Sequence, residues 1–417
     1  MLREPPRERE GASWAIVGAW SLLVFITIPL ANAIQERIDR EIGGGFFLAV
    51  VLAAIALGAL AGLRGIAREG GAAGPPRALW LVAIATVLAA YTWSLRGSPA
   101  EAVHFVEYGV LGLLLYRAFL HRVRDASIYV DAALMAALVG TLDEAIQWLT
   151  PGRTWALRDV WLNFSGAALT LAALAIGVRP RLVTERTGRA GVRRIVAIAA
   201  VLAAVVTLSL LNTPPRIAWY SANVPGLGFT RNATGVMLEY GHRYDAPDTG
   251  VFRSRFAPAE LAALDNARGA EAGAILAAYA TDERYDEFLA RYTPVTDPFV
   301  HEARVHLFRR DRILDLADDR PGDEEWYRWH VSTAHRENAI LERWFPRTLA
   351  AAGAALPAEV RARLARDQDP GFALPSRVSA DLVTELSEAQ VLGGMLALLA
   401  ALAVAWWAAR EGPAAHA

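Results

Sequence analysis

The sequence contains no cysteine and no lysine. The absence of cysteine excludes disulfide bonds, iron–sulfur clusters and thiolate chemistry. The absence of lysine leaves arginine as the main basic residue, which we interpret as the compositional bias of a bacterium with a GC-rich genome. Because the formal net charge is only −1, the chain has no overall positive field that would attract nucleic acid, and we predict no nucleic-acid partner.

Long apolar runs are abundant instead. Hydrophobic residues make up 54% of the 417 residues, more than an ordinary soluble enzyme contains. A membrane-spanning helix requires about 20 mostly apolar residues. The stretches that meet this requirement are 13–33, 46–63, 78–95, 103–120, 127–149, 160–178, 195–211 and 389–409. The first stretch differs from a cleaved signal peptide, because no small-residue cleavage site stands out after it. We therefore predict a mainly α, polytopic helical membrane bundle of about eight spans.

Arginine placement predicts the orientation of this bundle, because cytoplasmic loops carry an excess of basic residues. If the N-terminus lies in the cytoplasm, the cytoplasmic loops hold the arginine clusters at 64–77, 117–124 and 179–194. The short outer loops then hold few arginines, and eight spans return the C-terminus to the cytoplasm. We predict a multi-pass protein of the bacterial inner (cytoplasmic) membrane, surrounded by membrane lipids.

The spans divide the chain into three parts. Residues 1–211 form a seven-span membrane region, residues 212–388 a polar insertion, and residues 389–417 a last span with a short cytoplasmic tail. Within the insertion, aromatic and β-branched residues alternate around 247–250, which predicts a β-hairpin. From Pro258 onward the apolar residues follow a helical period, and the basic run at 309–312 is typical of a solvated helix face. The insertion is therefore predicted to be an extracytoplasmic α+β domain.

Polar residues gather at the outer ends of three predicted spans. One span starts with a His, a Glu and a Tyr at positions i, i+3 and i+4, which share one helix face. The next span ends with a Glu and a Gln at i, i+3, and the third begins with an Asp and an Asn at i, i+4. Between these two spans, a Pro-Gly turn at 151–152 carries an Arg back to the same level. This candidate polar site consists of His104, Glu107, Tyr108, Glu144, Gln147, Arg153, Asp159 and Asn163.

Each of these residues also has a purely structural explanation. His104 fits an interfacial hydrogen-bonded histidine, Asp159 a helix N-cap or dipole partner, and Glu144 with Arg153 a loop-closing salt bridge. For the set as a whole we favour a functional site. Ionisable residues inside a membrane each cost at least a few kcal/mol and usually mark a functional site.

The sequence around these polar residues resembles the VanZ-like membrane family, whose namesake is an accessory protein of teicoplanin resistance. The resemblance covers roughly residues 91–178, and the stretch "SLLVFITIPL" resembles the first span of the family. It rests on the series His104-Phe105-x-x-Tyr108, Asp143-Glu144-x-x-Gln147, Pro151-Gly152-Arg153 and Asp159-x-x-x-Asn163-x-x-Gly166. Family members often carry a histidine where this chain has Ile146, and the insertion is not part of the family core.

The resemblance implies a role in the cell envelope or in the response to teicoplanin-type glycopeptides. A first hypothesis is that the site binds the headgroup of an amphiphilic envelope molecule, such as a lipid-linked precursor or a glycopeptide. A second is an enzyme acting on a lipid-linked precursor, with His104 and Glu144 or Glu107 as acid and base. A third is a non-catalytic scaffold that presents the insertion to a partner, and a transporter is a fourth. Catalytic residues are not assigned, and we expect no cofactor.

The insertion also contains two histidine pairs, His301 with His306 and His330 with His335. Zinc-protease helices place their two histidines at i, i+4 with an intervening Glu, so that both face one ion. The pairs here are at i, i+5, about 140° apart on a helix. We therefore predict no metal site from these pairs alone.

Overall fold

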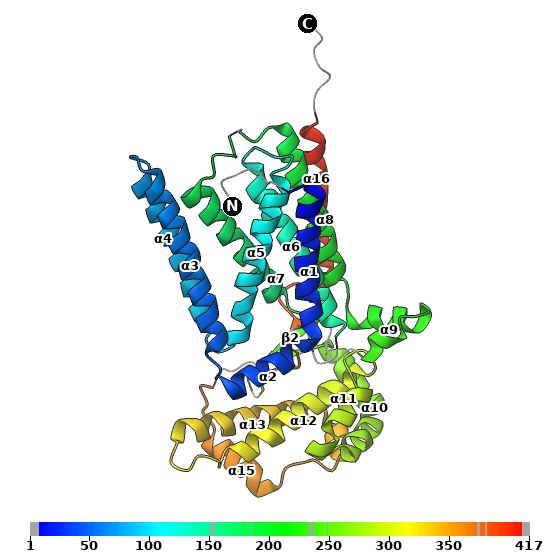
Figure 1. Ribbon diagram of the computed structural model, residues 1–417. Coiled ribbons are helices and arrows are strands. Elements are labelled where there is room, and N and C mark those ends of the chain that lie inside the picture. The colour runs from blue at the N-terminus through cyan, green and yellow to red at the C-terminus, as the bar shows by residue number, and fades with distance from the viewer. Residues whose placement is uncertain are drawn as a thin grey trace. The chain divides into compact units, whose positions relative to one another are not determined.

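The computed structural model describes residues 8–150, 153, 155–184, 186–232, 237–247, 249–372, 376–379 and 382–410. It is mainly helical and divides into two compact units (Figure 1). The membrane unit comprises residues 1–208 and 393–417, and the inserted unit comprises residues 209–392. This architecture confirms the predicted fold class, a helical membrane bundle with an inserted α+β region.

Every predicted span corresponds to a helix. The membrane helices are α1 (Glu10–Thr27), α2 (Ala31–Glu41), α3 (Phe46–Glu69), α4 (Gly74–Ser94), α5 (Val103–Phe119), α6 (Ser127–Trp148), α7 (Leu157–Ala172), α8 (Arg189–Leu210) and α16 (Glu388–Ala408). A 3₁₀ turn, η1 (Ile28–Leu30), joins α1 to α2, a second one, η2 (Pro99–Ala102), leads into α5, and a π-helical turn, η3 (Ala173–Val178), extends α7. Among the described residues, seven helical segments are long and apolar enough to cross a membrane.

The predicted span at 127–149, which is not among these seven, is α6. It is as long as the others, with 22 residues, but it is more polar because it carries Asp131, Asp143 and Glu144. It packs against both α5 and α7, which precede and follow it in the chain. Phe105 of α5 lies beside Gly166 of α7, and Gly109 lies beside Thr170, so α5 and α7 run in the same direction and the helix between them must return the chain to the first side. We therefore infer that α6 crosses as well.

Small residues allow α5, α6 and α7 to pack closely. A Cβ atom on Gly166 of α7 would lie 3.0 Å from the Cα atom of Phe105 on α5. A Cβ atom on Gly140 of α6 would lie 2.8 Å from the Cβ atom of Asn163 on α7. Both distances are tighter than ordinary van der Waals contact, so these helices approach one another only because both positions are glycine.

Ion pairs tie several helices together at the end of the membrane unit where α5 finishes. Arg117 of α5 binds Glu8 with Nε–Oε1 at 2.6 Å, and the buried carboxylate of Asp131 accepts a hydrogen bond from Arg194 of α8 at 2.6 Å. At the same end, the Arg193 guanidinium lies 4.5 Å from the ring centre of Trp406 in α16. These contacts link α5 to the segment before α1, and link α6 and α16 to α8, at this end of the bundle.

The inserted unit is built from short strands and longer helices. Its helices are α9 (Pro214–Asn223), α10 (Pro258–Ala278), α11 (Tyr285–Arg291), α12 (Pro298–Leu316), α13 (Glu324–Trp344), α14 (Pro346–Ala351) and α15 (Ala358–Asp367), with 3₁₀ turns η4 (Gly228–Asn232) and η5 (Asp282–Arg284). Its strands are β1 (Glu239–Tyr240), β2 (His242–Ala246), β3 (Gly250–Ser254), β4 (Ser376–Arg377) and β5 (Leu382–Val383). The core packs Phe252 of β3 against aromatic and aliphatic residues of α10, α12 and α13.

Strand pairing confirms the predicted hairpin. β2 and β3 are antiparallel, with Tyr244 opposite Phe252, and β4 adds to β3 in parallel. The first and last strands of the unit, β1 and β5, form a separate parallel pair. Asp248, which belongs to the predicted turn at 247–250, lies outside the described residues.

The prediction of a solvated face at 309–312 was wrong for two of its arginines. Arg310 of α12 is only 2% exposed, and its Nη2 donates to the carbonyl oxygen of Ala354 at 2.8 Å. Arg309 is partly buried and binds the buried Glu337 carboxylate with Nη1–Oε1 at 2.9 Å. The packing of α12 against α13 encloses these side chains, which the local charge pattern did not indicate.

Candidate functional site

The three predicted helix ends meet in the membrane unit. At the start of α5, His104 and Glu107 lie one helical turn apart, with Nδ1 and Oε2 separated by 3.6 Å. Both side chains are partly exposed, at 16% and 26%. Tyr108 follows on the same face but is buried, and its hydroxyl donates to Oδ2 of Asp143 on α6 at 3.0 Å. The predicted i, i+3, i+4 face therefore exists, and Tyr108 anchors it to α6.

The end of α6 forms a buried polar network. Gln147 donates from Nε2 to Oδ2 of Asp143 at 3.3 Å and to Oε1 of Glu144 at 3.0 Å. All three side chains are almost completely enclosed, with 4%, 1% and 0% of their surfaces exposed. Hydrogen bonds between these groups offset part of the free energy lost when they leave water. This network therefore holds the end of α6 in one conformation and packs it against Tyr108.

The connection from α6 to α7 brings Arg153 back to the same level, as predicted. Its guanidinium donates to Oε1 of Gln147 and to Oδ1 of Asn32 on α2, each at 2.9 Å. The proposed salt bridge between Glu144 and Arg153 was wrong as a structural explanation, since Glu144 instead accepts the backbone N–H of Ala156 at 3.3 Å. The predicted turn at 151–152 lies outside the described residues.

The start of α7 contributes Asp159 and Asn163. Ala156 is the N-cap residue, so the alternative in which Asp159 caps the helix was wrong. Asp159 instead lies in the first helical turn, where a carboxylate interacts favourably with the helix dipole. Asn163 is completely buried beside Gly140. Among the described residues its side-chain amide has no hydrogen-bond partner.

These residues surround a cavity of about 720 Å³ in the membrane unit. Of the eight predicted site residues, His104, Glu107, Gln147, Arg153 and Asp159 line it. The other three, Tyr108, Glu144 and Asn163, are buried and are not part of the lining. The structure therefore separates the predicted set into residues that face the cavity and residues that are buried outside its lining.

The sequence interpretation missed the opposite wall of the cavity. That wall comes from the end of α1 and from α2, which contribute Thr27, Gln35 and Asp39. Gln35 and Asp39 are i, i+4 neighbours and share one helix face, a signal that was present in the sequence "AIQERIDRE". Two acidic residues, Glu101 of η2 and Asp143 of α6, also line the cavity and were absent from the predicted site.

Acidic groups outnumber basic groups in the described lining of the cavity. The carboxyl groups are those of Asp39, Glu101, Glu107, Asp143 and Asp159, whereas Arg153 supplies the guanidinium. A second arginine, Arg158, is more exposed and pairs with Glu101 at 2.7 Å. Carboxylates accept hydrogen bonds and attract positive charge. The lining therefore suits amine, hydroxyl and amide N–H groups better than a phosphate.

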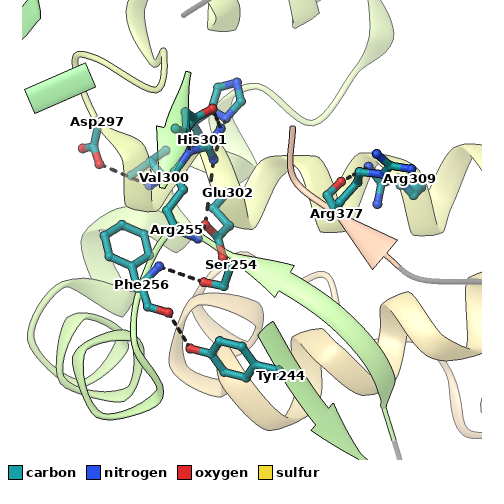
Figure 2. Close-up of polar contacts among 11 residues, drawn as sticks. Tyr244, Ser254, Arg255, Phe256, Asp297, Val300, His301, Glu302, Arg309 and Arg377 are labelled. Atoms are coloured by element: carbon teal, nitrogen blue, oxygen red, sulfur yellow. Dashed lines mark hydrogen bonds and ion pairs between the residues drawn. The ribbon is translucent and has the colours of Figure 1, made fainter. Parts of the chain in front are cut away.

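A second polar cluster lies in the inserted unit (Figure 2). Arg255, at the end of β3, binds Glu239 and lies 3.8 Å from Oε2 of Glu302 on α12. Its side chain is 6% exposed, and those of the two glutamates are 3% and 0% exposed. Figure 2 also shows His301 beside Arg255, with Nδ1 accepting from Nη1 at 3.4 Å. The cluster joins β1, β3 and α12 through buried charges, which is a structural arrangement.

The two histidines of the first pair, His301 and His306, occupy different surroundings. His306 binds Glu337 of α13 at 2.7 Å, whereas His301 on the same helix contacts Arg255. Among the described residues, no group of three His, Asp or Glu side chains is placed to hold a metal ion. Burial would raise the pKa of Glu337, but His306 and Arg309 together hold it below its usual range.

His301 should make the inserted unit less stable in acid. Burial and the Arg255 guanidinium lower the pKa of this histidine to about 3. In the unfolded chain the value returns to about 6.5, so between these limits the unfolded state binds more protons and stability falls as pH falls. Below about pH 6 we expect a loss of up to about 1.4 kcal/mol per pH unit from this residue.

The measurement compares the wild type with His301→Gln, using chemical denaturation of the full chain at several pH values. Glu302, whose pKa is raised by burial, is present in both proteins, so its contribution cancels in the difference. Parallel stability curves for the two proteins would contradict the assignment.

Comparison with known proteins places all eight predicted site residues, which form part of the cavity region, within a family match. Residues 70–177 match the family model described as VanZ/LLP1. The matched segment includes α4, α5, α6, α7 and all eight predicted site residues, and it extends the resemblance seen at 91–178 toward the N-terminus. No curated protein and no solved structure matches the chain. The chain is therefore a multi-pass membrane protein whose residues 70–177 form a VanZ-like region.

Proposed function

We propose that this protein binds the polar headgroup of an amphiphilic cell-envelope molecule in the cavity between α2, η2 and α5–α7. The observation that carries the proposal is the acid-lined cavity itself, which lies at one end of membrane-spanning helices. Headgroups of membrane-inserted molecules lie at that depth, whereas their chains remain in the hydrocarbon region. An envelope-directed role also agrees with the VanZ/LLP1 match.

The lining supports a headgroup that is rich in hydrogen-bond donors. Glu107 and Asp159 can accept hydrogen bonds from amines or hydroxyls, and Arg153 can hold one carboxylate or carbonyl oxygen. An acylated glycopeptide of the teicoplanin type carries such groups together with a hydrocarbon chain. A lipid-linked phosphate precursor is less favoured, because a single guanidinium faces several carboxyl groups in the described lining.

Arginine placement supports an orientation for this site. Arg117, Arg122 and Arg194 lie at the end of the membrane unit opposite the start of α5. Under the positive-inside rule that end belongs in the cytoplasm. We therefore propose a bacterial inner-membrane protein with both termini inside, and with the cavity and the inserted unit outside.

A purely structural role is the second candidate, and the buried network of Tyr108, Asp143, Glu144 and Gln147 favours it. Those side chains bind one another and are enclosed by α5 and α6. If the polar residues served only this network, substitution of Glu107 or Asp159, which line the cavity but do not belong to the network, would leave function intact.

Variants at the two levels of the site separate these candidates. A deletion strain is complemented with the wild type, Glu107→Gln, Asp159→Asn or Glu144→Gln, and teicoplanin susceptibility and membrane abundance are measured together. We expect the two cavity variants to keep normal abundance and lose rescue, because a lost charge-assisted hydrogen bond weakens binding by about tenfold or more. Glu144→Gln is expected to lower abundance instead.

The matched control is Glu41→Gln. Glu41 lies on α2, is 58% exposed and pairs only with Arg37 in the described structure, outside the cavity lining. This variant should rescue fully. If Glu107→Gln and Asp159→Asn also rescue fully at normal abundance, the headgroup proposal is wrong and the structural candidate gains support.

A further inference from the structure

The membrane unit contains a second cavity of very different character. It measures about 510 Å³ and is lined by α3, α4, α5, α7 and η3. Figure 1 shows the hairpin of α3 and α4 on one side of α5. Its lining is alanine, glycine, valine, leucine, isoleucine and phenylalanine, with Thr170 of α7 as the one polar side chain among the described residues that line it. A volume of this size is within the range of known ligand sites, about 300–1,000 Å³.

Small residues on one face of α3 create this apolar groove. Gly58, Gly62 and Gly65 are spaced by three to four residues, so they lie along one stripe of the helix. At Gly62 the stripe touches α4, where an added Cβ would lie 2.6 Å from Leu81. At Gly58 an added Cβ would have nothing within 4 Å, so the groove is open there.

The dimensions of the groove suit a hydrocarbon chain. The lining residues on α3 run from Ala54 to Gly65, which corresponds to about 16 Å along the helix axis. This length is about half of the roughly 30 Å hydrocarbon core of a bilayer. Because the lining offers one hydroxyl and no charge, an occupant at this depth must be apolar.

The groove and the acid-lined cavity share a single turn of α5. Val103, His104 and Glu107 line the cavity, whereas Phe105 and Val106 between them line the groove. Helix α3 likewise contributes Phe47 to the cavity and Ala54 to the groove, about 10 Å further along its axis. A molecule with a polar head and an apolar tail can therefore contact both sites across this turn.

We propose that the groove holds the hydrocarbon chain of the same amphiphile whose headgroup enters the cavity. This inference rests on the proposed function and narrows its ligand class to molecules with a long chain. Lipid tails are as apolar as the groove, so the chain gains affinity from shape and packing against α3 and α5 rather than from leaving water.

Photolabelling provides the test. The purified full chain is placed in phosphatidylethanolamine–phosphatidylglycerol vesicles that contain a phosphatidylglycerol with a diazirine in its acyl chain. Labelled peptides from α3 and α5 are quantified by mass spectrometry, with teicoplanin or its deacylated core added as competitor. Binding of both glycopeptides is measured separately by calorimetry.

We expect teicoplanin to displace the lipid label from residues 54–65 and 105–113, and the deacylated core to leave it in place. Gly58→Phe fills the open part of the groove and should weaken teicoplanin binding roughly tenfold while leaving binding of the core unchanged. Gly18→Phe is the matched control, because Gly18 on α1 also has nothing within 4 Å of an added Cβ and lies outside the groove. It should behave like the wild type.

Two results would overturn the inference in distinguishable ways. If both glycopeptides bind equally well and neither displaces the label, the headgroup proposal stands, but the groove holds only bilayer lipid. If neither glycopeptide binds the wild type, the proposed function fails, and the proposal that the groove holds the ligand's hydrocarbon chain fails with it.

Discussion

Replacement of Arg255 by methionine should strongly destabilise the inserted unit. Methionine keeps much of the side-chain volume but leaves Glu239 and Glu302 buried without their guanidinium partner. Removing one member of a buried ion pair costs about 3–5 kcal/mol, a large share of the roughly 5–15 kcal/mol that stabilises a typical domain. Hydrogen exchange of α12 and α13 in the full chain measures the effect, and we expect protection there to fall by at least about a hundredfold.

Arg253→Met on the same strand is the matched control. Arg253 pairs with Glu385, whose side chain is 58% exposed, and exposed pairs contribute only about 0–1 kcal/mol. Its exchange pattern should remain close to that of the wild type. Equal loss of protection in the two variants would show that the burial of charge around Arg255 is not what holds β1, β3 and α12 together.

Gly166→Leu should prevent the VanZ-like region from assembling. The first added carbon already lies 3.0 Å from the Cα atom and 3.3 Å from the carbonyl oxygen of Phe105, and these backbone atoms cannot rotate away. The leucine side chain would force α7 away from α5 and open the contact that positions Asp159 and Asn163. We expect an overpacking penalty of about 1–3 kcal/mol or more and a several-fold lower yield of folded protein.

The assay is size-exclusion chromatography of detergent-extracted, fluorescently tagged protein. Teicoplanin binding is then measured on the fraction that elutes as folded protein. Gly18→Leu on α1 adds the same side chain where nothing lies within 4 Å and should leave the yield unchanged. If Gly166→Leu accumulates like that control, close packing of α5 against α7 does not limit assembly.

Hydropathy predicted the membrane helices well, because the energy of placing a helix in lipid depends mainly on the side chains of that segment. Charged residues within a helix weaken a prediction that is based on hydropathy. Helix α6 carries Asp131, Asp143 and Glu144, and its crossing follows from its neighbours rather than from its own apolar content. The spacing of polar residues also predicted which side chains share a helix face, because that property is local.

Partner choice between helices was not predictable in this way. Arg153 bonds to Asn32 rather than to Glu144, since the position of α2 depends on the path of the chain after η1. The cavity wall from α2 was missed for the same reason. In the inserted unit, the burial of Arg310 depends on how α12 meets α13, which no local charge pattern reveals.

The pairing of β1 with β5 has a consequence for how this protein could have been assembled in evolution. These strands lie near the beginning and the end of the inserted unit, and Arg216 and Glu388 form an ion pair near the same two points of the chain. An element whose entry and exit lie side by side can be accommodated in a host chain at little entropic expense, because the closing distance is already short. The inserted unit therefore brings its own entry and exit points together through a strand pair and an ion pair, which suits it to insertion between the last two helices of a bundle.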